Sequence, residues 1–440
     1  MRITLWTLAL ALCAASGASA QQRDTVPRPD SARADSVAKA KADSAAAADS
    51  AFFAQQLQQG AAADSGRTPT TGATGPTNPR LLPDVSAVGD LVGDLSPRES
   101  TQEDGSRFGV REVELALQAA VDPFFRGDVF LGISDLESIS IEQAYLTATA
   151  LPWGLEVRLG RFLMPTGKQN TTHRHDLHTI EYPYVIQRFL GEEGLKGTGI
   201  WASKIFAPFA FYQELQLTAV DRFGEPEEGL TVSEPANKKL SGLGYSARFR
   251  NYWDLSQSAN VEVAATAVTG RREQPIGNPF PPFPTSISGV NARQTVVGAD
   301  FTYRWRPLQQ GLYKSFILQA EVMRQINQRM SGQLVGDPFG GSALAPYEGP
   351  DRDFSGAYVF GRYQLTRRLF LGSRYDWLQD PGAGGETLQA GSGYLEFFPS
   401  EFSKLMIGYE HLFADGDAQD TDRILLQAAF ALGPHRPHPF

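Results

Sequence analysis

The sequence has almost no cysteine: Cys13 is the only one in 440 residues. It stands in an apolar stretch that follows Arg2 and ends at Ala18-Ser19-Ala20, which is the pattern of a cleavable export signal over residues 1–20. Leu12 occupies the position where a lipoprotein signal needs a small residue. An exported chain without disulfides must be held together by its core or by closure of a sheet.

Other absences narrow the class of protein. After the export signal no run of eighteen apolar residues occurs, so no transmembrane helix is predicted. The net charge of −9 disfavours nucleic acid as a partner. The chain has no nucleophile elbow and no metalloprotease helix, and GEEGLKGTG at Gly191 lacks the Lys-Ser/Thr end of a phosphate loop. These patterns predict a protein that is not an enzyme and needs no cofactor.

Composition divides the exported chain into two parts. Residues 21–82 are rich in Ala, Asp, Ser and Pro and contain few large apolar side chains. They are predicted to be a low-complexity periplasmic segment, either a marginal helix or a solvated stretch that orders on meeting a partner. Residues 83–440 follow a different pattern and are predicted to form a second domain.

In this second domain apolar and polar residues alternate. Val113, Leu115 and Leu117 share one face of a predicted strand, while Glu112 and Glu114 share the other. The same period predicts about sixteen strands, near 84–95, 107–121, 126–134, 138–150, 155–163, 197–206, 209–221, 239–251, 259–271, 292–306, 312–326, 354–365, 369–379, 387–397, 402–413 and 422–432. The fold class is therefore all-β.

The connections between these strands alternate between short turns and longer loops. Aromatic residues such as Trp153 and Phe398 gather at the short turns, as at a membrane interface. This rhythm is typical of an up-and-down antiparallel transmembrane β-barrel, with short periplasmic turns and long outside loops. We therefore expect localisation in the outer membrane, with lipid as a partner around the barrel.

Sixteen strands enclose an aqueous interior, and the polar face of each strand points into it. The arginines predicted on this face are Arg158, Arg248, Arg250, Arg304, Arg306, Arg362 and Arg374. Two interpretations stay open: the arginines form a basic ring that favours anions, or they pair with carboxylates and brace the wall.

FGVREVELALQAAVDPFFRGDVFLGI, IEQAYLTATALPWGLEVRLGRFLMPTGKQN and RFLGEEGLKGTG, which lie between Phe108 and Gly199, resemble a porin-like group of outer-membrane barrels. The stretch is similar to the phosphate-selective porin O/P superfamily. The resemblance implies passive passage of small hydrophilic solutes or ions, and a homotrimer as a candidate assembly. True TonB-dependent receptors are longer and carry a plug domain, so energised uptake is not implied.

Residues 164–196 include NTTHRHDLHTIEYP and correspond to the third outside loop, which in resembling porins narrows the pore. The predicted constriction residues are Lys168, His173, Arg174, His175, His178 and Arg188. The same histidines with Asp176 have ligand chemistry suited to zinc, so a receptor for metal uptake is an alternative function. A solvated polar loop is a third interpretation, and a structural barrel anchored through residues 21–82 is a further function.

Overall fold

The computed structural model of the chain describes residues 83–102, 105–134, 139–209, 211–221, 240–272, 286–327, 331–335, 345–348, 353–381, 385–413 and 420–433. The chain divides into two units at Pro76, and every described residue belongs to the second unit. The predicted export signal, the segment 21–82 and residues 434–440 lie outside the described residues.

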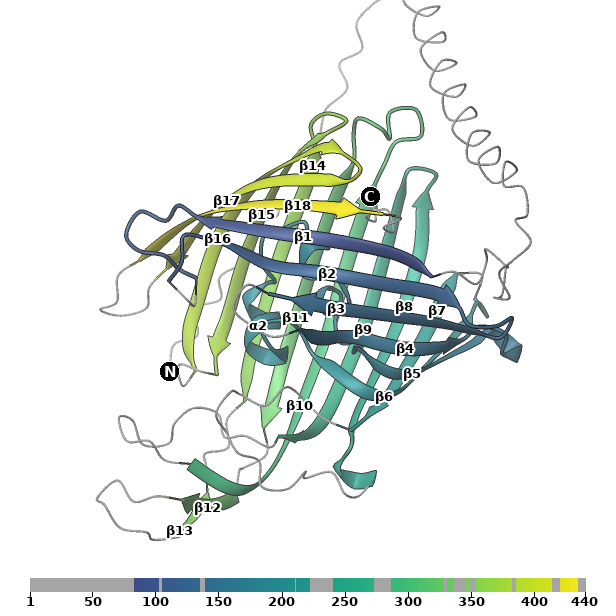
Figure 1. Cartoon of the computed structure of the whole chain (residues 1–440), viewed down its shortest axis with the longest axis vertical. Helices are drawn as coiled ribbons and strands as arrows, with labels where there is room; N and C mark the ends of the chain where they lie inside the picture. The colour runs from purple at the N-terminus through teal and green to yellow at the C-terminus, as the bar shows by residue number, and fades with distance from the viewer. Residues whose placement is uncertain are drawn as a thin grey trace, which may run out of the picture. The chain divides into compact units, whose positions relative to one another are not determined.

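The described residues form one large antiparallel sheet (Figure 1). Its strands are β1 (Asp84–Asp94), β2 (Phe108–Ala120), β3 (Phe125–Ile133), β4 (Ser140–Ala148), β5 (Leu155–Leu163), β6 (Lys196–Phe206), β7 (Tyr212–Val220), β8 (Gly244–Ser256), β9 (Ala259–Arg272), β10 (Ser286–Trp305), β11 (Phe316–Asn327), β14 (Phe354–Gln364), β15 (Leu369–Asp380), β16 (Glu386–Ser400), β17 (Ser403–Phe413) and β18 (Thr421–Leu432). A hairpin of β12 (Ser331–Val335) and β13 (Ala345–Glu348) pairs with the beginning of β10.

The sheet closes on itself because β1 pairs with β2 along one edge and with β18 along the other. Val88 faces Glu114 on β2 and Ala431 on β18 across these two ladders. Closure pairs the backbone N–H and C=O groups of both edge strands, and a sheet within lipid needs these groups to be hydrogen-bonded. The predicted all-β, sixteen-strand antiparallel barrel is therefore confirmed.

The strands are polar on the buried face and apolar on the exposed face. Along β15, Leu371, Tyr375 and Trp377 are exposed, whereas Arg374 and Asp376 are almost completely buried. β17 repeats this order. A protein in water would have the opposite arrangement, and apolar residues outside a charged interior are what a membrane barrel needs.

Strand positions differ from the sequence prediction mainly at three places. β8 runs to Ser256 and turns over Gln257 and Ser258, so the link expected near Trp253 is part of the strand. β10 begins at Ser286, before the predicted residue 292, and carries the β12–β13 hairpin. β11 begins at Phe316, because the residues before it form a hydrogen-bonded turn in which Tyr313 donates to the carbonyl of Gln310.

Aromatic side chains at the short turns divide between two environments. Phe124, Trp153 and Phe209 are exposed around the short-turn end, as an interfacial belt requires. Phe370 and Phe398 instead point into the lumen, so their assignment to the belt was wrong. No described helix is long and apolar enough to cross a membrane.

Candidate functional site: the lumen and its inserted loop

The connection between β5 and β6, residues 164–195, lies inside the barrel. It contains the single turns η3 (Gln169–Thr171) and η4 (Arg174–Asp176) and the short helix α2 (Tyr184–Leu190). The helix contacts β14 and β15, and Figure 1 shows it enclosed among the strands. Its buried residues Val185, Ile186 and Phe189 share one apolar cluster with Met323, Phe360 and other lumen residues of β9 to β16, and the cluster continues to Phe162, Trp201 and Val220 of β5 to β7. This apolar contact docks the loop against one wall.

Two glycines allow the loop to approach the wall closely. A side chain at Gly356 on β14 would meet the Cγ2 atom of Val185 at 2.7 Å and the Cβ atom of Leu378 at 2.8 Å. Gly167 has a φ angle of +72°, and a Cβ atom there would overlap the carboxylate of Glu321 on β11. Glycine is therefore needed at both positions.

Basic side chains of the wall hold the loop by its backbone. Lys404 Nζ donates to the carbonyl oxygens of His175 at 2.6 Å and Leu177 at 3.0 Å. Arg111 donates to the carbonyl of Ile180, and Arg374 donates to that of Glu181. These bonds satisfy carbonyls that the irregular segment 175–181 cannot pair within itself.

Carboxylates neutralise these buried cations and extend the network. Arg374 pairs with Asp376 at 2.6 Å, and Arg423 joins Glu181 and Glu410 at 3.1 and 3.0 Å. Tyr184 donates its hydroxyl hydrogen to Glu410 at 2.7 Å. Burial would raise the pKa of Glu181, but the Arg423 guanidinium lowers it below its usual value, so the carboxylate stays ionised.

The three histidines of the loop have different polar partners, although the rings of His173 and His175 lie 5.6 Å apart. His173 Nδ1 lies 2.7 Å from the carboxylate of Glu114, and its Nε2 accepts from Gln143 at 2.8 Å. His175 is buried with its Nε2 3.6 Å from Asp176. The ring of His178 is stacked beside that of Phe360, with 6.4 Å between ring centroids, and its Nδ1 lies 3.8 Å from the carboxylate of Glu396. No three metal-ligating side chains converge among the described residues, so this geometry does not support the metal alternative, which remains a prediction.

The surroundings separate the titration of these histidines. Burial lowers the pKa of His175 to about 4, against the attraction of Asp176. Burial and Arg362 lower the pKa of His178. Burial would lower the pKa of His173 as well, but the Glu114 carboxylate raises it above its usual value. The three rings therefore do not gain charge together in mild acid.

The remaining predicted constriction residues also lie on the loop, in different surroundings. Lys168 reaches Glu262 on β9, with 2.8 Å between Nζ and the carboxylate oxygen. Arg174 donates to the carbonyl of Glu192 within the loop. Arg188 lies 3.5 Å from Asp380 near the long-loop end of β15. Only Lys168, of these three, lines the cavity described below.

Except for Arg306, the predicted lumen arginines are paired with carboxylates. Arg248 contacts Asp300 at 2.9 Å, Arg250 contacts Glu214 at 2.6 Å, and Arg304 lies 3.6 Å from Glu262. Arg362 pairs with Glu396, and Arg158 with Glu156. Arg306 lies beyond the end of β10, where its Nε donates to the carbonyl of Gly311, so its predicted place on a strand face was wrong.

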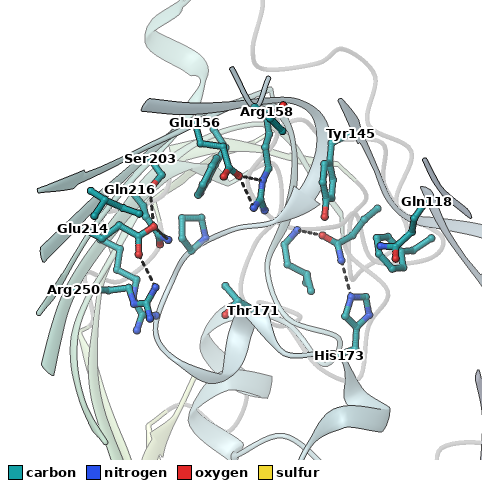
Figure 2. Close-up of a pocket in the computed structure, with 18 of the residues that line it drawn as sticks. Gln118, Tyr145, Glu156, Arg158, Thr171, His173, Ser203, Glu214, Gln216 and Arg250 are labelled. Carbon is teal, nitrogen blue, oxygen red and sulfur yellow. Dashed lines mark hydrogen bonds and ion pairs between the residues drawn. The ribbon is translucent and has the colours of Figure 1, made fainter. Parts of the chain in front are cut away.

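A cavity of about 710 Å³ separates the loop from the opposite wall, β2 to β8. Figure 2 shows Glu156 and Arg158 of β5, Ser203 of β6, Glu214 and Gln216 of β7 and Arg250 of β8 around it, with Thr171 and His173 on the loop side. The cavity reaches the short-turn end, because Thr149, Leu151 and Gly154 of the β4–β5 turn also line it. The lumen is thus filled on one side and hollow on the other.

Three residues that hold the loop were missing from the predicted site. Lys404 and Arg423 lie on the buried face of their strands, so the alternation of β17 and β18 contained the signal. Arg111 could not be found in this way. It is the extra residue of a β-bulge, since Asp90 pairs with Glu112 while Leu91 pairs with Val110, and the bulge brings its side chain to Asp90.

No family model matches the chain. A protein of Aquifex aeolicus described as uncharacterised is 28% identical over 357 residues, covering 76% of this chain and 70% of that protein. Among solved structures, OmpT of Vibrio cholerae matches with a TM-score of 0.48 and 10% identity, covering 80% of this chain and 97% of that one. The outer membrane channel DcaP of Acinetobacter baumannii matches with a TM-score of 0.47 and 14% identity, covering 80% and 98%.

The strand pairing of the chain itself establishes the fold. A closed sixteen-strand antiparallel barrel with an apolar outer face and a charged interior is a porin-like outer-membrane barrel. The resemblance noted in the sequence is confirmed at this level, whereas membership of the phosphate-selective porin O/P superfamily stays a prediction.

Proposed function

We propose that the protein is a passive outer-membrane channel for small hydrophilic solutes, with residues 164–196 as its constriction. The observation that carries this proposal is the loop fixed inside a charged lumen that remains hollow along β2 to β8. Solutes cross between the loop and this wall, and no catalytic step is involved. Long loops face outside, short turns face the periplasm, and the assembly that the sequence resemblance implies is a homotrimer.

Conductance in planar bilayers tests the channel. The full-length barrel is expected to give stepwise ion conductance, and silence of folded, inserted protein would contradict the proposal. Cys13, in the predicted export signal, is the only cysteine of the sequence. A single cysteine introduced into the barrel can therefore be labelled selectively to locate the conduction path. A thiol reagent should block Thr171→Cys in the cavity and leave Ile200→Cys on the outer face conducting. Equal conductance before and after labelling of Thr171→Cys would place the path elsewhere.

Preference for anions is a finer part of the proposal. Arg304 and Arg306 remain the candidate residues, although Arg304 lies near the carboxylate of Glu262. Replacing both by Gln should move the reversal potential in a salt gradient toward cations if they select anions. An unchanged reversal potential would show that they only brace the wall.

A further inference from the structure

The cavity beside β2 to β8 contains an unusual set of free hydrogen-bonding atoms around Arg158. The guanidinium lies over the ring of Trp201 at 4.2 Å and that of Tyr145 at 5.2 Å, which fixes its plane. Its Nε and Nη2 donate to the same oxygen of Glu156, Oε1, at 3.0 and 2.8 Å. Within the described chain, Arg158 Nη1 and Glu156 Oε2 have no such partner, so a donor and an acceptor stand side by side.

Two glutamines add further acceptors. The side-chain nitrogen of Gln118 donates to Asp128, and that of Gln216 donates to Glu214, both at 2.8 Å. Their carbonyl oxygens have no partner among the described residues, and both residues line the cavity. Three acceptor oxygens, Glu156 Oε2 and the two glutamine carbonyls, therefore stand near the free N–H groups of Arg158. A matching ligand must be able both to donate and to accept hydrogen bonds.

The charges of the cavity balance one another. Besides the Arg158–Glu156 pair, Arg250 is paired with Glu214, and His173 lies 2.7 Å from Glu114. A free anion brings only acceptors and would have to compete for cations that already have partners. A cation would be repelled by the guanidinium of Arg158. A hydroxyl group both donates and accepts, so it binds such a pair without breaking it.

We propose that this cavity contains a binding subsite for uncharged polyhydroxyl solutes of sugar size, centred on Glu156 and Arg158. Adjacent hydroxyls would donate to Glu156 Oε2 and accept from Arg158 Nη1. Gln216, in register with Glu156 through Ser203, and Gln118, on the other side of Arg158, extend the acceptors along the wall in the two directions. The volume of about 710 Å³ falls within the range of roughly 300–1,000 Å³ common for small-molecule sites. The subsite rests on the proposed channel function and names its solute class.

The test measures binding in detergent, independently of conductance. Ligand-observed NMR would follow D-glucose, inorganic phosphate and methylammonium with the folded full-length barrel. Saturable glucose binding is expected, with phosphate and methylammonium weaker. Arg158→Met should raise the half-saturation concentration for glucose about tenfold, because a charge-assisted hydrogen bond is lost. Glu156→Gln should weaken glucose binding and strengthen phosphate binding, since it leaves Arg158 without its carboxylate.

Arg324 of β11 offers a control away from the cavity. Its Nη2 donates to Asp353 at 3.0 Å, and it does not line the cavity. Arg324→Met should leave glucose binding unchanged. Absence of glucose binding, tighter binding of phosphate or methylammonium, or equal loss in Arg324→Met would overturn the subsite. Glucose binding by a barrel that never conducts would instead contradict the channel and leave the subsite standing.

Discussion

The two walls of the lumen differ although their outer faces are alike. Along β9 to β16 the lumen face contains Val268, Val296, Met323 and Leu378, and the loop covers it with its own apolar residues. Along β2 to β8 charged and amide side chains line an open cavity. Lipid requires only an apolar outside, so the inner face is free to vary. Variation of that face decides where the loop docks and where space remains.

Removing Arg374 should disturb the docked side most. Its side chain is 1% exposed and is bonded to Asp376, Glu410 and the carbonyl of Glu181. Arg374→Ala leaves buried Asp376 without its cation, which costs about 3–5 kcal/mol, whereas Glu410 keeps Arg423 at 3.0 Å. Urea unfolding in lipid vesicles measures the loss. A change below about 1 kcal/mol would mean that water reaches the Asp376 carboxylate.

Loss of the apolar contact made by α2 should have the next largest effect. Ile186→Ala deletes a fully buried side chain and should lower the free energy of loop opening by about 2–5 kcal/mol. Ile200→Ala is the matched control, because Ile200 is 52% exposed on the outer face and makes no contact with the loop's apolar cluster. Hydrogen exchange of residues 184–190 reports loop opening. Equal protection in both variants would contradict docking by this cluster.

Lys404 tests the polar part of the same contact. Lys404→Met removes the donors to the carbonyls of His175 and Leu177, and hydrogen bonds to charged groups contribute about 1.5–3 kcal/mol each. The loop should become accessible to protease while the barrel stays folded. Lys204→Met, on an exposed position of β6, should leave cleavage unchanged. If the loop of the Lys404→Met variant resists protease as the unchanged protein does, the apolar cluster alone is enough to hold it in place.

Mild acid should have the smallest effect, a partial loss of the free energy that holds the loop against the wall. His175 has a folded pKa of about 4, below its usual value of 6.5, so the folded state holds the ring neutral. Stability from this group is present above about pH 6.5 and falls as the pH drops toward 4, by up to ~1.4 kcal/mol per unit. His173, whose pKa is raised, acts in the opposite sense above pH 6.5. Loop protection should therefore decline in acid, and less so in His175→Gln.

Much of the barrel could be predicted because each strand carries its own signal. In β17, exposed apolar Leu405 and Ile407 alternate with a buried face that carries Lys404 and Glu410, and the short turn from β16 gives the register. The β12–β13 hairpin could not be predicted, because it extends a loop beyond the barrel and has no lipid face to impose alternation. Local patterns specify strands but do not specify what a loop adds to them.

The site was less accessible to prediction for a physical reason. The contact between Lys404 and His175 joins residues 229 positions apart, and only closure of the barrel brings them together. The histidine spacing indicated ligands for one ion, but His173 meets Glu114 of β2 and His178 meets Glu396 of β16, while His175 lies beside Asp176 of the loop itself. Pairing of the lumen arginines with carboxylates was one of two interpretations left open, and Arg248 and Asp300 contact each other on this face.

Asn170 closes the base of the inserted loop. Its amide nitrogen donates to the carbonyls of Met164 and Leu195, and its oxygen accepts from the backbone N–H of Leu195 at 2.6 Å. The two ends of the insert are thus joined directly to each other. The segment is consequently a self-contained insert of the β5–β6 hairpin. Replacing it by the equivalent segment of a similar barrel should change the lumen, and with it the proposed path, while leaving the pairing of the strands as it is.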